Sequence, residues 1–219
     1  MTYTGHVTPD GPADVRELDE ATIRKVSVGE LDNCCYLVTC RATGTQLLID
    51  AADNADRLVG LIEESGPRLD LVLTTHRHWD HHRALAQVVR RTGATTMAGV
   101  DDADAIPVPT DRALVHGEEF DVGRLRMRVV QLRGHTPGSL AVACWAGGST
   151  HLFSGDSLFP GGLGNTQGDP ARFARLLRDV EERVFAVYDD DTWVYPGHGA
   201  DTTLGTERPA LPEWRARGW

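Results

Sequence analysis

The chain has 219 residues, of which 41% are hydrophobic and 25% charged, and this fits one globular domain with a full-sized core. Its net charge is −10 and it has no basic run, which argues against a nucleic-acid partner. It lacks both an apolar run of roughly 20 residues and a signal-peptide start, so we expect a cytoplasmic protein with no membrane partner.

Residues 1–20 are rich in Pro, Gly and Asp and show no period, which predicts a mobile N-terminal arm before one domain at 21–219. Along that domain, apolar runs predict strands and apolar residues at helical spacing predict helices. In the first half these are strands at 21–28, 34–39, 46–50 and 71–74, a helix capped by Asp53 and Asn54 and ended at Gly66, and a helix from Ala84 that Gly93 closes.

The second half repeats this mixture. We expect strands at 125–132, 140–145, 151–154 and 192–195, with a helix that Asp169 and Pro170 open. Because each half has strands followed by helices, the pattern favours an α+β domain of the layered αββα type. His116 and His151 match no motif, and we expect them to be surface or strand residues.

The strand at 71–74 runs into a loop with four potential metal ligands, His76, His78, Asp80 and His81. Histidine and aspartate are costly to bury without partners, and a turn does not require them at alternate positions. Zinc and its neighbours prefer imidazole nitrogen and carboxylate oxygen. Two apart on an extended segment, His76 and His78 point the same way and can bind one ion. Asp80 and His81 follow where a second ion fits.

Three further ligands, His135, Asp156 and His198, also follow predicted strands, and each stands beside glycine. Glycine lets the backbone turn sharply and approach an ion without interference from Cβ. With the first loop they make five histidines and two aspartates, a set that suits two divalent metal ions and leaves room for water.

The motifs HxHxDH, GHTPGS, GD and GHG occur in this order, and in this respect the chain resembles the metallo-β-lactamase fold superfamily, within it the glyoxalase II-like (hydroxyacylglutathione hydrolase-like) branch. The resemblance runs from about residue 23 to 198 and beyond. It implies a four-layer αββα sandwich with the site at one edge of two packed sheets. It also implies one metal held by His76, His78 and His135, another held by Asp80, His81 and His198, and Asp156 as a bridge between them.

The residues and the resemblance favour the same chemistry. Two ions about 3.5–4 Å apart can share a hydroxide that attacks a carbonyl, while one ion stabilises the oxyanion. We expect Asp80 or Asp156 to orient this nucleophile. A thiolate, with a pKa near ~8.5, leaves without a general acid, whereas an amine requires protonation. The sequence therefore predicts a binuclear metallohydrolase of a thioester or similar small ester, with zinc as the expected metal and iron or manganese as alternatives.

Three alternatives stay open at this point. A persulfide dioxygenase-like enzyme would use a single iron at His76, His135 and Asp156. A lactonase or phosphodiester-type hydrolase would use both metals, and a non-catalytic metal-binding protein would keep only the fold. Full-length glyoxalase II enzymes are longer, with a C-terminal helical domain that contacts glutathione. Since this chain ends at Trp219, the resemblance leaves the thiol carrier open, as it does the acyl group and the oligomeric state.

Overall fold

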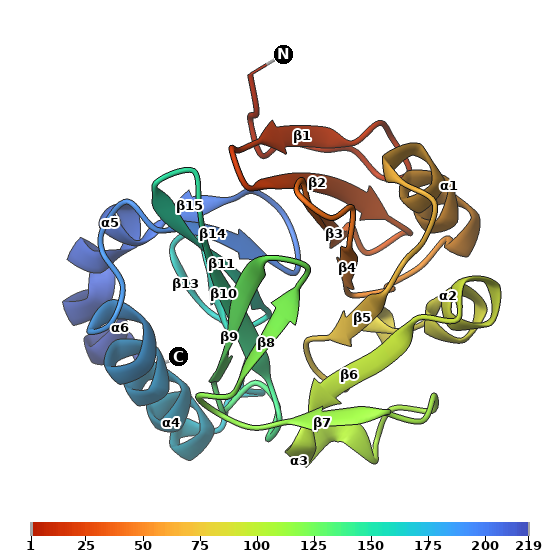
Figure 1. The fold of residues 1–219 in the computed structure, drawn as a ribbon. Helices are drawn as coiled ribbons and strands as arrows, with labels where there is room; N and C mark the ends of the chain where they lie inside the picture. Colours follow the sequence, from red (N-terminus) through yellow and green to blue (C-terminus); the bar gives the residue numbers. More distant parts are fainter. Residues whose placement is uncertain (1, 219) are drawn as a thin grey trace.

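The computed structural model describes residues 2–218, which form four layers in the order helix, sheet, sheet, helix (Figure 1). This confirms the predicted αββα sandwich. The first sheet has seven strands in sequence order: β1 (Asp14–Glu17), β2 (Ala21–Val28), β3 (Asn33–Cys40), β4 (Gln46–Ile49), β5 (Leu71–Thr74), β6 (Thr95–Gly99) and β7 (Arg112–Leu114). Strands β1 to β4 pair antiparallel, and β4 to β7 pair parallel.

The second sheet has six strands in the order β15-β14-β11-β10-β9-β8. Its strands are β8 (Glu119–Val122), β9 (Leu125–Gln131), β10 (Leu140–Ala146), β11 (Ser149–Gly155), β14 (Trp193–Pro196) and β15 (Thr202–Thr203). Between β11 and β14 the chain forms a small hairpin, β12 (Leu158–Phe159) with β13 (Gly162–Leu163). Strand β14 pairs parallel with β11, so the residues that follow these two strands emerge at the same edge of the sheet.

The two sheets enclose a central core to which both contribute, with Val38, Leu47 and Leu73 from one and Val142 and Phe153 from the other. One further hydrophobic cluster lies between the first sheet and its outer helices, and another lies between the second sheet and its outer helices. This arrangement follows from the sequence, because strands that are apolar on both faces must be covered on both sides. The helices are α1 (Ala55–Ser65), α2 (Leu85–Thr92), α3 (Val100–Ala103), α4 (Pro170–Val180), α5 (Leu204–Glu207) and α6 (Leu211–Arg217).

The N-terminal segment contains structure that the sequence did not predict. Strand β1 pairs with β2, and Tyr3 packs on the edge of the central core. The buried ammonium of Lys25 donates to the carbonyl of Gly5 at 2.8 Å and pairs with Asp201 at 2.6 Å, so it joins this segment to the loop after β14. The mobility of residues 1–20 stays a prediction, and Met1 and Trp219 lie outside the described residues.

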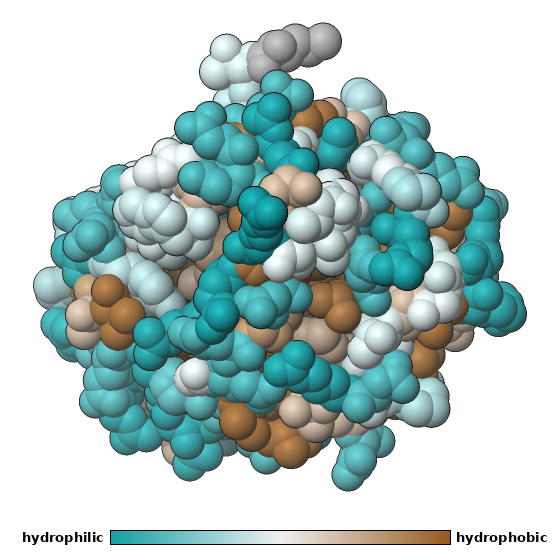
Figure 2. Space-filling model, in the orientation of Figure 1, coloured by the Kyte–Doolittle hydropathy of each residue, from teal (hydrophilic) through white to brown (hydrophobic). Residues whose placement is uncertain are grey.

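The outer surface is mainly hydrophilic in the view of Figure 2, with small hydrophobic patches between polar side chains. Across residues 2–218, no helix is both long enough and apolar enough to cross a membrane.

Candidate metal centre

Four loops bring the predicted ligands together, and each loop follows a strand. His76, His78, Asp80 and His81 lie after β5 in the first sheet. The other three lie after β9, β11 and β14 in the second sheet, in the order His135, Asp156 and His198. The site is therefore built from both sheets. All seven sequence-predicted residues fall into three groups whose ligand atoms lie within 4.8 Å of one another.

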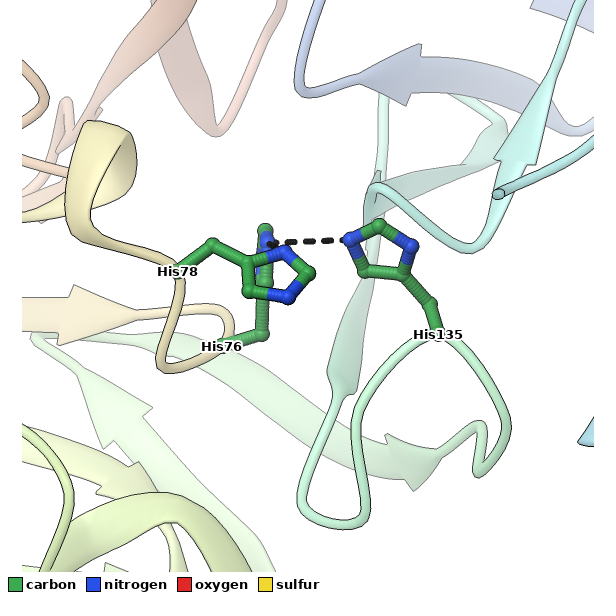
Figure 3. A group of neighbouring side chains, drawn as sticks. All are labelled: His76, His78 and His135. Atoms are coloured by element: carbon green, nitrogen blue, oxygen red, sulfur yellow. Dashed lines mark hydrogen bonds between the residues drawn. The ribbon is translucent and has the colours of Figure 1, made fainter. Parts of the chain in front are cut away.

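The first group is His76, His78 and His135, whose imidazole rings turn toward one another in Figure 3. The Nε2 atom of His76 lies 3.1 Å from Nδ1 of His78 and 3.2 Å from Nε2 of His135. Two nitrogens bound tetrahedrally to one zinc ion at about 2.05 Å would stand about 3.3 Å apart. The spacing of these three nitrogens fits one shared cation.

Asp80, His81 and His198 form a second group. The Nε2 atoms of His81 and His198 are 3.3 Å apart, and the Oδ2 atom of Asp80 lies 3.6 Å from the first and 3.5 Å from the second. Asn33 donates from Nδ2 to the same Oδ2 atom at 3.1 Å, which holds the carboxylate in place. This spacing again suits one cation.

Asp156 forms the third group with His76 from the first group and His81 from the second, so it lies between the first two. Its Oδ2 atom is 3.7 Å from Nε2 of His135 and 3.6 Å from Nε2 of His198, while its Oδ1 atom is 3.4 Å from Nε2 of His81. Oδ1 is buried and accepts no hydrogen bond from residues 2–218, and burying a carboxylate oxygen without one is costly. A cation would supply the missing partner, so the residues present fit two divalent metal ions with Asp156 between them.

The protonation states of His76 and Asp156 suit metal binding, whereas carboxylates raise the pKa of His81 and of His198 against the effect of burial, so that binding a metal there would release protons. Burial lowers the pKa of His76 well below its ordinary value, and the neighbouring histidines His81 and His135 lower it further. Burial raises the pKa of Asp156, but the nearby His81, with His198 and His135, outweighs this effect and lowers it overall. A neutral imidazole and an ionised carboxylate are the forms that ligate metals.

The outer nitrogens of the histidines are fixed by hydrogen bonds. His135 donates from Nδ1 to the carbonyl of Asn165 at 2.8 Å, and His198 donates from Nδ1 to the carbonyl of Leu31 at 2.9 Å. The Nδ1 atom of His81 lies 2.9 Å from Oδ2 of Asp50. Such contacts set the ring orientation and leave Nε2 to face the site.

Sequence reasoning missed Asp50 and Asn33, which support the ligands without belonging to any motif. Asp50 follows β4, is buried, and also accepts hydrogen bonds from the backbone and hydroxyl of Thr75. A buried aspartate directly after an apolar strand was the available signal. Asn165, in the loop between β13 and α4, contributes its backbone carbonyl to His135. Trp79, within the ligand loop, is exposed, with the Arg83 guanidinium over its ring.

Comparison with known proteins identifies the family. The metallo-beta-lactamase superfamily model matches residues 28–198. The chain is 36% identical over 133 residues to a hydroxyacylglutathione hydrolase of Rhodospirillum rubrum, a match that covers 61% of this chain and 50% of that protein. It thus spans about half the length of that relative.

Two solved structures are similar along most of the chain. The crystal structure of ETHE1 from Myxococcus xanthus has a TM-score of 0.76 at 29% identity and covers 89% of this chain and 84% of that one. The crystal structure of TTHA1623 in a di-iron-bound form has a TM-score of 0.67 at 31% identity and covers 84% of this chain and 96% of that one. The chain belongs to the metallo-beta-lactamase superfamily, in its glyoxalase II-like branch.

Proposed function

We propose that the protein is a binuclear metal-dependent hydrolase that cleaves a thioester or a similar small ester. The observation that carries this proposal is the position of Asp156 between two groups of ligands, with a buried Oδ1 atom that accepts no hydrogen bond. His76, His78 and His135 would hold one ion, and Asp80, His81 and His198 the other. Bound there, the two ions would supply hydroxide at neutral pH and stabilise the oxyanion that forms on the attacked carbonyl.

The side chains of the chain then have distinct tasks. Asp156 holds the two groups at a fixed spacing through its two oxygens. Asp80, whose Oδ2 atom receives a hydrogen bond from Asn33, orients the attacking water. The hydrogen bonds from His135 and His198 to backbone carbonyls keep the rings in place, so little reorganisation is required during the reaction.

The leaving group favours a thioester among the possible substrates. A thiolate with a pKa near ~8.5 departs without a proton, whereas an amine must be protonated as it leaves. The hydroxyacylglutathione hydrolases among the relatives support the same reaction class. The chain spans about half to two thirds of the length of those relatives. The proposal therefore extends to the reaction class and not to the acyl group or the thiol carrier of their substrates.

The metal is expected to be zinc, but the di-iron form of one similar structure makes iron the alternative to test. A single-iron dioxygenase would need only His76, His135 and Asp156, which also meet here. The two functions differ in their use of the second group, Asp80, His81 and His198.

A substitution in each group separates these functions. We expect His78→Ala and Asp156→Ala to abolish hydrolysis of a thioester panel and to lower metal content, because each removes a ligand. His198→Ala should also abolish hydrolysis, since it removes a ligand of the second ion. The hydrolase proposal would be wrong if the wild-type protein consumed oxygen with a persulfide and His198→Ala kept that dioxygenase activity in full.

A further inference from the structure

A cavity of about 360 Å³ is lined by four arginines, two of them on the loops that carry His76, His78 and His135. Arg77 comes from the loop after β5 and Arg133 from the loop after β9, whereas Arg172 and Arg175 lie on α4. The remaining lining residues are small or uncharged, namely Gly134, Thr136, Pro137 and Ala171. Four guanidinium groups at one cavity are unusual in a chain whose net charge is −10.

The cavity is lined by sequence neighbours of the first group of candidate ligands, although none of those ligands lines it. Arg77 stands between His76 and His78 in the sequence, and Gly134 and Thr136 flank His135. A molecule in the cavity would therefore contact the same two loops that carry these histidines. Helix α4 closes the other side, at the lower left of Figure 1.

Two of the four arginines have carboxylate partners. Arg133 forms two hydrogen bonds of 2.8 Å with the buried Asp179, and Nε of Arg77 lies 3.7 Å from the buried Asp102. Both carboxylates are already engaged, since Asp102 also accepts hydrogen bonds from two backbone amides and from Thr136.

The other two arginines leave the cavity positive. Arg172 donates to the carbonyls of Gly134, at 2.8 Å, and His135, and to Oε1 of Gln167 at 3.1 Å. These acceptors are neutral, so its charge is not compensated. Arg175 is exposed, and no hydrogen bond or ion pair ties it to another residue within 2–218.

We infer that this cavity binds an anionic oxo group, a carboxylate or a phosphate, of the molecule whose ester the metal centre hydrolyses, and this inference rests on the proposed function. Guanidinium groups bind both anions through paired, charge-assisted hydrogen bonds. Arg175 offers unused donors, while Arg77 and Arg133 are held in place by buried carboxylates. The positive cavity would attract such an anion locally, although the net charge of the chain is negative.

Two substitutions on α4 test the inference. Arg175→Gln removes the uncompensated charge, and Arg178→Gln is the matched control, because Arg178 is also exposed on α4 but lines a different groove. Calorimetry on the metal-loaded protein would measure Kd for inorganic phosphate, coenzyme A and glutathione. We expect Arg175→Gln to weaken binding of a carrier about tenfold and Arg178→Gln to leave it unchanged. Any anion bound at the metals themselves affects both variants equally.

The probes distinguish the source of the anion. Weaker binding of coenzyme A alone would identify a phosphate, and weaker binding of glutathione alone a carboxylate. Equal Kd values in both variants, or an effect confined to inorganic phosphate, would overturn the inference.

Steady-state kinetics separates the cavity from the function. For a thioester of the preferred carrier, Arg175→Gln should raise KM with kcat retained, whereas KM for a thioester of the uncharged N-acetylcysteamine should not change. If the protein hydrolyses no thioester but binding still depends on Arg175, the proposed function fails and the anion site stands. If hydrolysis is normal but KM and Kd do not depend on Arg175, the anion site fails alone.

Discussion

The backbone approaches the centre of the site closely at Gly197. A Cβ atom at this position would lie 2.2 Å from Oδ1 of Asp156 and 2.8 Å from Cε1 of His81. Only glycine leaves room for both side chains, which gives the late GHG motif a steric reason. The space around the predicted ligands therefore restricts position 197, beside His198, to glycine.

We expect Gly197→Ala to lose most of its metal and at least tenfold of its hydrolytic rate, because the added methyl group displaces Asp156. Metal analysis and rates with one thioester would measure this. Gly60→Ala is the control, since its Cβ meets nothing within 4 Å on α1 and should stabilise the helix by about 0.5–1 kcal/mol. Normal metal content in Gly197→Ala would refute the steric argument.

Asp50 is expected to act through His81. Asp50→Asn weakens the contact to Nδ1 of His81, and we expect metal affinity to fall by roughly 10- to 100-fold, as for other residues that orient a ligand. Competition with a chelator of known affinity would measure it. Asp70→Asn is a suitable control, because Asp70 also accepts a backbone hydrogen bond, from Gln46, without contacting any of the seven predicted ligands. Equal affinity in both variants would contradict the role of Asp50.

Sequence could reveal the seven candidate ligands because four of them fall within six positions, and because each of the other three follows a predicted strand beside a glycine. It could not reveal Asp50 or Asn33. Asp50 contacts His81 across 31 positions and Asn33 contacts Asp80 across 47, and local spacing does not encode such a contact. Their roles become visible only when the strands that carry them are placed side by side.

At the scale of elements, the second sheet contains a buried polar network. Tyr195 on β14 and His151 on β11 are both buried, with Nδ1 of His151 2.8 Å from the Tyr195 hydroxyl. Nε2 of His151 lies 3.2 Å from the carbonyl of Ala146, and Arg16 donates to the Tyr195 hydroxyl at 3.2 Å. A neutral His151 that donates from Nε2 and accepts at Nδ1 satisfies every partner. His151 is thus a strand residue, one of the two places the sequence allowed.

This network predicts a pH-dependent stability. Burial and the Arg16 charge lower the pKa of His151 from 6.5 to about 4. Between these values the unfolded chain binds a proton that the folded chain does not, so stability is lost as the pH falls from 6.5 toward 4. From about pH 7.5 to about pH 5 the contribution amounts to about 2 kcal/mol. Urea unfolding of wild type and His151→Gln should show this difference, and parallel pH profiles would contradict it.

The elements that sequence predicted are long or strongly apolar. Strand β2 has the predicted bounds, and α1 and α4 begin at the predicted caps, Asn54 and Asp169. The elements it missed are short or polar, such as β7, with three residues of which two are exposed. Strands of this kind are defined by their neighbours in the sheet, and little of that information lies in their own residues.

At the scale of the whole molecule, the metal centre joins the two sheets. The loop after β5 belongs to the first sheet, and the loops with His135, Asp156 and His198 belong to the second. The αββα architecture followed from the order of strands and helices, but the meeting of these loops at one edge depends on sheet packing. A ligand set divided between the sheets makes metal binding and the packing of the two halves interdependent.

Metal content per chain, measured by elemental analysis on protein purified without added metal, tests the binuclear site most directly. The structure, with two ligand groups that meet at Asp156, predicts about two divalent ions per chain, and about one in His198→Ala. About one iron per chain in wild type, unchanged in His198→Ala, would contradict the binuclear hydrolase and favour a mononuclear dioxygenase.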